Sequence, residues 1–226
     1  MEPYRNRVGT DMEEFAWIVQ VRMKERYGCG KTARHPVQIQ IIAGADVAYT
    51  GEYGIGVVVL MSYPSLELLS HVYTKRQVLF PYIPGLFAFR EFPLIMAAFE
   101  KMKKIPDLLF IDGHGYAHPR RFGYACHAGA VLGIPTIGIA KRPLTLQVKI
   151  PGIEQGSYKE ILMEGEVTGI TLRTKRGAPP VYVSAGYQTS LPYAFRMALD
   201  TTCGRRIPES IRIADFIACK YRNYFS

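Results

Sequence analysis

The chain has few cysteines, and their spacing argues against a disulfide or zinc framework. Its 226 residues include four cysteines, and no two of them form a C-x-x-C pair. Such wide spacing is typical of reduced thiols in an intracellular protein. The four are Cys29, Cys126, Cys203 and Cys219.

Long apolar runs are also missing. The longest weakly polar stretch runs from Ala128 to Ala140, is interrupted by Gly133 and Pro135, and is too short to cross a bilayer. The first residues show no apolar signal core and soon include acidic side chains. We therefore expect a cytoplasmic protein that does not bind membranes, and no obligate protein partner is indicated.

Negative charge is in the minority. The sequence has 28 Lys and Arg against 19 Asp and Glu, which gives a net charge of +9. The excess is dispersed along the chain, a distribution that suits binding to a polyanion better than a disordered basic tail would. A merely solvated basic surface has the same composition, so charge alone does not establish nucleic-acid binding.

The first half of the chain predicts a helix followed by a β-meander. Charged residues alternate with Phe15, Trp17, Ile18 and Val21, which predicts an amphipathic helix ending near Gly28. Three β-rich runs follow, and their short connections indicate antiparallel strands. These runs are 37–48, 54–62 and 66–77.

The remaining sequence predicts parallel strands alternating with helices. Apolar residues at helical spacing around Phe92 and Phe99 predict a helix with one buried face. The apolar runs 107–112 and 135–140, separated by a helix at 121–132, are typical of central parallel strands. We expect one α/β domain over residues 1–226, with a mixed sheet and helices on both faces. Further strands are expected at 166–174 and 181–184, and further helices at 192–199 and 211–221.

Acidic residues lie at the ends of two predicted strands. Asp46 closes the first strand and Asp112 the fourth, and a helical crossover would make those strands parallel neighbours. Glu91 begins the crossover helix, and Asp215 lies on the last helix, which could dock at the same edge. Converging carboxylates suit an anionic substrate only if they hold a cation such as Mg²⁺. Individually, each acid could equally be a cap or an ion-pair partner.

A glycine-rich loop follows Asp112. Its glycines permit close backbone approach, and the helix after it would offer N–H groups to a phosphate or a base. His114 and His118 with Cys126 and His127 allow a zinc site as an alternative, but glycine and proline between the histidines disfavour it. Proton transfer or phosphate contact by His118 is favoured. Lys141, after the last apolar strand, could supply charge to a scissile phosphate.

Several motifs, in order, resemble those of the endonuclease V family. The resemblance covers about residues 10–222. It implies a ribonuclease H-like fold and a Mg²⁺-dependent endonuclease, with Mn²⁺ expected to substitute. It also implies recognition of deoxyinosine in DNA or inosine in RNA and hydrolysis of the second phosphodiester bond on the 3′ side, leaving 3′-hydroxyl and 5′-phosphate ends. The motifs are Gly44 to Tyr49, Pro81 to Leu86, Phe89-Arg90-Glu91, Asp112 to Gly115, His118-Pro119-Arg120, Ala140-Lys141, Arg206 to Glu209 and Arg212 to Asp215.

The resemblance also implies roles for individual residues. Asp46, Glu91 and Asp112 would be metal ligands, and Asp215 a fourth acid near the metal, at a position that is Asp or His in the family. Lys141 would touch the phosphate, and His118 would lie beside the active site. Residues of the two loops would bind the substrate: Pro81, Tyr82, Ile83, Pro84, Gly85, Leu86, Arg90, Gly113, His114 and Gly115. Two positions depart from the family pattern, namely Tyr187, where relatives often have His, and Arg142-Pro143.

The sequence FPYIPG, residues 80–85, predicts a wedge. Pro81 and Pro84 restrict their own φ angles and favour extended neighbours, which leaves Tyr82 on a stiff, projecting loop. Its ring could replace an extruded base in the stack. The alternatives to base-specific cleavage are another ribonuclease H-like nuclease and a non-catalytic nucleic-acid-binding module. DNA and RNA remain equally open as substrates.

Overall fold

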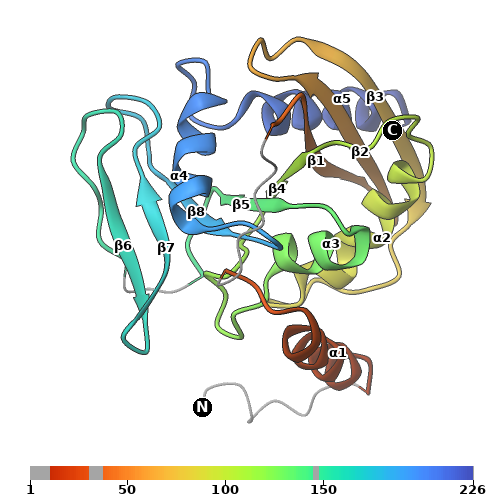
Figure 1. The fold of residues 1–226 in the computed structure, drawn as a ribbon. Helices are drawn as coiled ribbons and strands as arrows, with labels where there is room; N and C mark the ends of the chain where they lie inside the picture. Colours follow the sequence, from red (N-terminus) through yellow and green to blue (C-terminus); the bar gives the residue numbers. More distant parts are fainter. Residues whose placement is uncertain (1–10, 31–37, 145–147, 226) are drawn as a thin grey trace.

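The fold is built on an eight-stranded sheet with the strand order β3-β2-β1-β4-β5-β8-β7-β6 (Figure 1). The computed structural model describes residues 11–30, 38–144 and 148–225, so residue 37, where the first strand was predicted to begin, lies outside it. The strands are β1 (Ile41–Thr50), β2 (Tyr53–Ser62), β3 (Leu68–Gln77), β4 (Leu108–Asp112), β5 (Thr136–Ala140), β6 (Tyr158–Met163), β7 (Glu166–Leu172) and β8 (Val181–Ala185). The helices are α1 (Asp11–Tyr27), α2 (Phe87–Phe99), α3 (Tyr124–Leu132), α4 (Leu191–Asp200) and α5 (Glu209–Phe225).

Strand pairing confirms the predicted mixed sheet. β1, β2 and β3 form an antiparallel meander, and β4 then pairs in parallel with β1 and β5 in parallel with β4. The crossover through α2 therefore returns the chain to the edge of β1 that the meander leaves open. This step makes the first and fourth strands neighbours.

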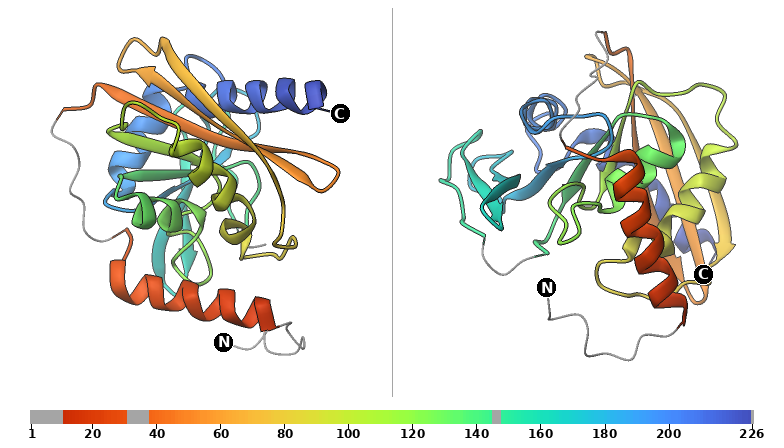
Figure 2. Two further views of the ribbon diagram at one scale, coloured as in Figure 1. Left: turned by 90° about the vertical axis from the view of Figure 1, so that its right-hand side faces the viewer. Right: turned by 60° about the horizontal axis from the view of Figure 1, so that its bottom comes forward.

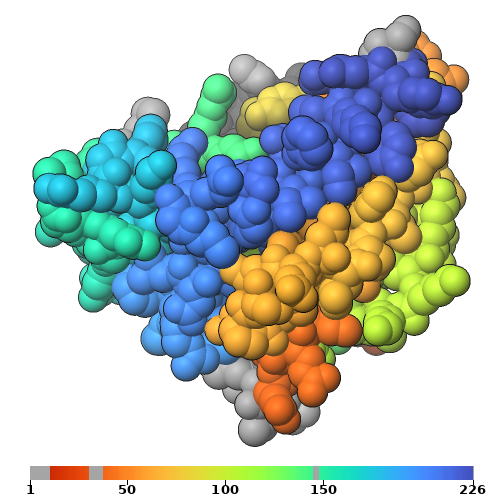
Figure 3. All heavy atoms as spheres, turned by 90° about the horizontal axis from the view of Figure 1, so that it is seen from above, coloured from red at the N-terminus to blue at the C-terminus, as the bar shows by residue number. Residues whose placement is uncertain are grey.

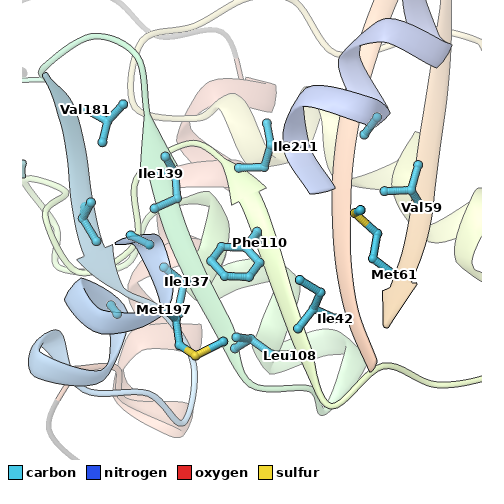
Figure 4. Packing of buried hydrophobic residues seen from close by; sticks show 14 of the residues in the cluster. Ile42, Val59, Met61, Leu108, Phe110, Ile137, Ile139, Val181, Met197 and Ile211 are labelled. Carbon is cyan, nitrogen blue, oxygen red and sulfur yellow. The ribbon is translucent and has the colours of Figure 1, made fainter. Parts of the chain in front are cut away.

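Helices cover both faces of the sheet, as predicted (Figure 2). One apolar core lies between the sheet and helices α4 and α5, with Ile42, Phe110 and Met197 among its members (Figure 4). A second core lies between the opposite face and helices α2 and α3. β4 and β5 contribute to these cores, which explains their almost wholly apolar sequences.

The sequence analysis missed one strand and placed the start of one helix too early. We did not predict β6, because this edge strand is largely exposed and its sequence carries little apolar alternation. α3 begins at Tyr124 and not at Arg121. Arg121 has φ +57°, a left-handed conformation that interrupts a helix before it can start.

The helix at the N-terminal end has the predicted extent but not the predicted buried face. Phe15 is 66% exposed, Trp17 and Ile18 are also exposed, and the buried residues of α1 are Ala16 and Gln20. α1 contacts α3 beyond the sheet, on the side of the molecule away from α5 (Figures 1 and 2). Its docking surface is therefore narrow and partly polar.

α5 approaches the sheet closely at a glycine. A Cβ atom at Gly44 would lie 2.3 Å from the backbone carbon of Ser210, so only glycine fits there. This contact brings the first turns of α5 onto β1, and the rest of α5 continues alongside β3 (Figure 3). Within the described part of the chain, none of the helices is both long and apolar enough to span a bilayer.

Candidate active site

Two carboxylates lie at matching ends of adjacent strands. Ala45 of β1 is paired with Ile111 of β4 in a parallel register, so Asp46 and Asp112 follow side by side. Neighbouring strands are about 4.8 Å apart. The predicted juxtaposition of these two acids therefore follows directly from the strand order.

Glu91 joins the two aspartates from α2. It is 5% exposed, and the Tyr49 hydroxyl donates a 2.8 Å hydrogen bond to its Oε1. The Arg90 guanidinium lies 4.7 Å from the centre of the Tyr49 ring and thereby packs this pair in place. Sequence reasoning included Tyr49 in a motif but missed this supporting contact, because no spacing rule relates a strand residue to a helix residue 42 positions later.

The carboxylates carry more negative charge than their surroundings compensate. Burial, followed by the charge of Asp112, raises the pKa of Asp46 well above its usual value. Burial also raises the pKa values of Glu91 and Asp112, and for Glu91 the neighbouring aspartates add to the effect. The cluster is thus poised to take up positive charge.

Lys141 supplies one positive charge to the cluster. Its Nζ lies 2.6 Å from Asp112 Oδ2. Burial alone would lower the pKa of Lys141, but the Asp112 carboxylate, together with the charges of Asp46 and Asp215, outweighs burial and raises it. Arg206, which sequence reasoning did not single out within its motif, donates to the Lys141 carbonyl at 3.3 Å. Its charge, like that of Lys141, partly offsets the rise in the pKa of Asp112.

Asp215 reaches the same cluster from α5. The closeness and negative charge of its carboxylate contribute, after burial and Asp112, to the raised pKa of Asp46. The docking of α5 at Gly44 is what brings this residue from the C-terminal end to the first strand. The four predicted acids and Lys141 are therefore together in space.

The donor chemistry of this cluster fits a hard divalent cation. Carboxylate oxygens are the ligands that Mg²⁺ prefers. The raised pKa values reflect burial first and then the negative charge of the neighbouring acids, both of which such an ion would offset. As the side chains stand, the described residues contain no group of three or more His, Cys, Asp or Glu arranged to hold a metal ion. The described conformation has the Lys141 ammonium against Asp112.

His118 lies in a second network, between the two predicted substrate loops. Its Nδ1 accepts a 3.1 Å hydrogen bond from the Arg120 backbone N–H, so its Nε2 carries the proton and donates to the Gly85 carbonyl at 3.0 Å. Burial and the charge of Arg120 lower the pKa of His118 to about 3. Neutral His118 thus connects its own loop to Gly85.

The loop after Asp112 is held against the sheet. The Gly115 N–H donates to Ser184 Oγ at 2.8 Å, and a Cβ atom at Gly115 would lie 2.2 Å from the Ala185 carbonyl oxygen. His114 Nε2 lies 2.9 Å from the Arg142 carbonyl oxygen. The backbone at Arg142, one of the departures from the family pattern, therefore helps to position His114.

Tyr82 projects from a loop that is fixed at both ends. At one end Arg90 Nη1 donates to the Phe80 carbonyl at 2.7 Å, and at the other the Gly85 carbonyl accepts from His118. Tyr82 itself is 68% exposed, with its ring edge-on to Phe87 at 6.1 Å. Pro81 and Pro84 are also exposed, Ile83 and Gly85 are half-buried, and Leu86 is buried.

The residues of the zinc alternative lie in separate environments. His127 lies edge-on to the rings of Phe89 and Phe92, and Cys126 belongs to an apolar cluster with Cys29 and Phe122.

Tyr187, the other position that departs from the family pattern, donates its backbone N–H to Thr136 Oγ1, and its ring lies edge-on to Tyr27 of α1.

Buried His127 predicts acid-sensitive stability. Burial lowers its pKa from 6.5 to about 4, so at pH 5 the unfolded chain binds a proton that the folded chain does not. The stability associated with neutral His127 is complete above pH 6.5 and falls as the pH decreases towards 4, by about 2 kcal/mol at pH 5. Chemical denaturation at pH 7 and pH 5 should show a smaller difference for His127→Leu than for the wild type. His71→Asn, a variant of an exposed histidine, is the control. If it reduced the stability difference between pH 7 and pH 5 as much as His127→Leu does, this assignment would be wrong.

The comparisons with known proteins agree with one another. The family model described as Endonuclease V matches residues 23–216. An Endonuclease V of Roseiflexus sp. (strain RS-1) is 41% identical over 180 residues, which are 80% of this chain and 81% of that protein. The crystal structure of the Bacillus subtilis Endonuclease V has a TM-score of 0.88 at 33% identity and covers 96% of this chain and 94% of its own.

A second similar structure contains a nucleic acid. It is the Ciona intestinalis Endonuclease V in complex with a 24mer DNA containing an inosine followed by a ribo-adenosine. Its TM-score is 0.83 at 26% identity, and the match covers 96% of this chain and 100% of that one.

Proposed function

The chain belongs to the endonuclease V family, has a ribonuclease H-like fold and is a nuclease, and we propose that it cleaves nucleic acid beside hypoxanthine. The proposed reaction is Mg²⁺-dependent hydrolysis of the second phosphodiester bond 3′ to deoxyinosine or inosine, leaving 3′-hydroxyl and 5′-phosphate ends. We further propose that residues 1–226 act as one domain, an arrangement that the continuous eight-stranded sheet supports.

The observation that carries this proposal is the placement of Asp46 and Asp112 at matching ends of adjacent parallel strands. Buried Glu91 and half-buried Asp215 converge on the same edge, and Lys141 contacts Asp112. Such a cluster is costly to fold, because its members repel one another in a poorly solvated environment. A cluster of this kind is expected at a functional site.

We assign the binding of the metal to Asp46, Glu91 and Asp112. When bound, Mg²⁺ would supply Lewis acidity at the scissile phosphate and activate the attacking water. Tyr49 holds the Glu91 carboxylate in place for this role. Lys141, which is partly exposed beside Asp112, is placed to meet the negative charge of a phosphate that approaches the cluster.

We assign substrate recognition to the two loops. Gly113, His114 and Gly115 would line the pocket for the extruded base, where the fixed backbone can meet the base closely. Tyr82 would occupy the gap in the stack. Because both ring nitrogens of His118 are engaged within these loops, we propose that His118 positions the loops and does not transfer a proton.

A cleavage panel tests the proposal. Matched oligonucleotides with and without one inosine should be offered as DNA and RNA, single- and double-stranded, in Mg²⁺ and in EDTA. We expect Mg²⁺-dependent cleavage of inosine substrates only, and sequencing-gel mapping should place the nick at the second bond on the 3′ side. Equal cleavage of controls would indicate a nuclease without base preference. Binding without cleavage would indicate a non-catalytic module.

A further inference from the structure

The contact between α1 and the rest of the protein has a glutamine at its centre. Gln20 is 1% exposed, and with Ala16 it forms the buried face of α1. An apolar residue would bury the same area without having to satisfy an amide group. A buried polar side chain with all its groups paired instead specifies one particular arrangement of its neighbours.

The Gln20 amide bridges the two substrate loops. Its Nε2 donates to the Phe122 carbonyl at 2.5 Å and to the Gly85 carbonyl at 3.3 Å. Its Oε1 accepts a 2.5 Å hydrogen bond from Arg120 Nε. One side chain thus contacts the end of the wedge loop, residues 80–86, and the end of the base loop, residues 113–122.

Arg120 extends this bridge. With Nε held by Gln20, its Nη2 donates to the Gly85 carbonyl at 2.7 Å, beside the hydrogen bond from His118. The Gly85 carbonyl therefore receives donors from Gln20, Arg120 and His118, of which the Gln20 contact is the longest. The main effect of Gln20 is expected to be the orientation of the Arg120 guanidinium.

We propose that Gln20 is a positioning residue that fixes the wedge loop relative to the base loop, so that α1 sets the efficiency of cleavage in duplex nucleic acid. This inference rests on the proposed function, because it concerns the same two loops. In a duplex, Tyr82 must enter the stack while the extruded base occupies the pocket, so the separation of the loops matters. In a single strand there is less stacking to replace, and the separation matters less.

The test compares duplex and single-stranded deoxyinosine DNA in the presence of Mg²⁺. For Gln20→Ala and the bulkier, apolar Gln20→Leu, we expect the ratio of kcat/KM on duplex to kcat/KM on single strand to fall about 5-fold, the size of one lost hydrogen bond. Met23→Ala is the matched control, because Met23 holds α1 by apolar packing, in a cluster that includes Phe122, and not by hydrogen bonds to the loop carbonyls. The ratio of duplex to single-strand kcat/KM for Met23→Ala should equal that of the wild type, even if the melting temperature of this variant falls.

A double-mutant cycle with Tyr82→Ala identifies the route of the effect. If Gln20 acts through the wedge, Gln20→Ala should cause no further fall in the ratio once Tyr82 is removed. An unchanged ratio in both Gln20 variants, an equal fall in Met23→Ala, or an undiminished effect in the Tyr82→Ala background would each overturn the inference. Gln20 variants that are unfolded at the assay temperature would also overturn it, since the role would then be structural. A wild type that leaves inosine substrates intact would refute the proposed function itself.

Discussion

Asp46→Asn should abolish cleavage without unfolding the protein. The substitution keeps the shape of the side chain and removes one negative charge from a cluster in which burial and Asp112 already disfavour that charge. In metal-free buffer the variant should therefore melt at the same temperature as the wild type or higher, a common pattern when an active-site residue is replaced.

The loss of activity should be large because the charge is lost where a cation is expected to act. Removing a carboxylate ligand weakens binding of the metal and reduces the stabilisation of charge in the transition state, and we expect kcat/KM to fall by at least about 10³-fold. Asp112→Asn should have a similar effect, with the added loss of the charge partner of Lys141. Affinity for the inosine oligonucleotide should change little, since neither the basic side chains nor the two loops are altered.

Asp107→Asn is the matched control for charge. Asp107 lies just before β4, at the opposite end of the strand from Asp112, where its carboxylate accepts from the N–H groups of Gln40 and Ile41. The substitution Asp107→Asn therefore removes the same negative charge at a position away from the cluster. Single-turnover cleavage and fluorescence anisotropy should separate catalysis from binding in all three variants. Cleavage by Asp46→Asn at the rate of Asp107→Asn would refute the catalytic assignment.

The placement of the acid pair could be predicted because it depends on chain order and sheet rules. Asp46 and Asp112 each end an apolar strand, and a helical crossover after a meander leaves few positions for the next strand. The pairing of β1 with β4 confirmed that reasoning. The approach of α5 was harder to foresee, since it depends on a glycine in β1 that admits the backbone of a helix from the other end of the chain.

The supporting contacts could not be predicted from the sequence. Tyr49 and Gln20 act through side chains that meet distant elements, and neither has a spacing signal. In α1 the apolar residues predicted the wrong buried face, because Phe15 is exposed while polar Gln20 is buried. The spacing of apolar residues predicts the buried face of a helix only when burial of apolar area determines how the helix docks. The docking of α1 also depends on hydrogen bonds from Gln20 to loop carbonyls.

Tyr82→Ala should impair cleavage of duplex inosine substrates much more than cleavage of single strands. Tyr82 is 68% exposed, so its loss removes little packing and should leave the melting temperature nearly unchanged. Stacking of an aromatic ring on a base contributes about 1–3 kcal/mol. We therefore expect kcat/KM on the duplex to fall by about 5- to 150-fold.

The structure gives a reason for this selectivity. Phe80 is tied to Arg90, and Gly85 is tied to His118 and Arg120, so the loop between them is fixed before the substrate arrives. A preformed wedge loses little conformational entropy on entering the stack. Without the ring, the enzyme would have to extrude the base with nothing to fill the gap, a cost that a single strand largely avoids.

Two variants make the test specific. Tyr82→Phe keeps the ring and should retain most of the duplex activity, since stacking does not need the hydroxyl. Tyr224→Ala removes a similarly exposed ring near the far end of α5 and should leave both substrates unaffected. Kinetics on matched duplex and single-stranded substrates, with 2-aminopurine beside the inosine to report unstacking, would show the step that is lost. A loss of equal size on both substrates would mean that Tyr82 serves general binding and not base extrusion, because only extrusion from a duplex requires a ring to take the place of the base.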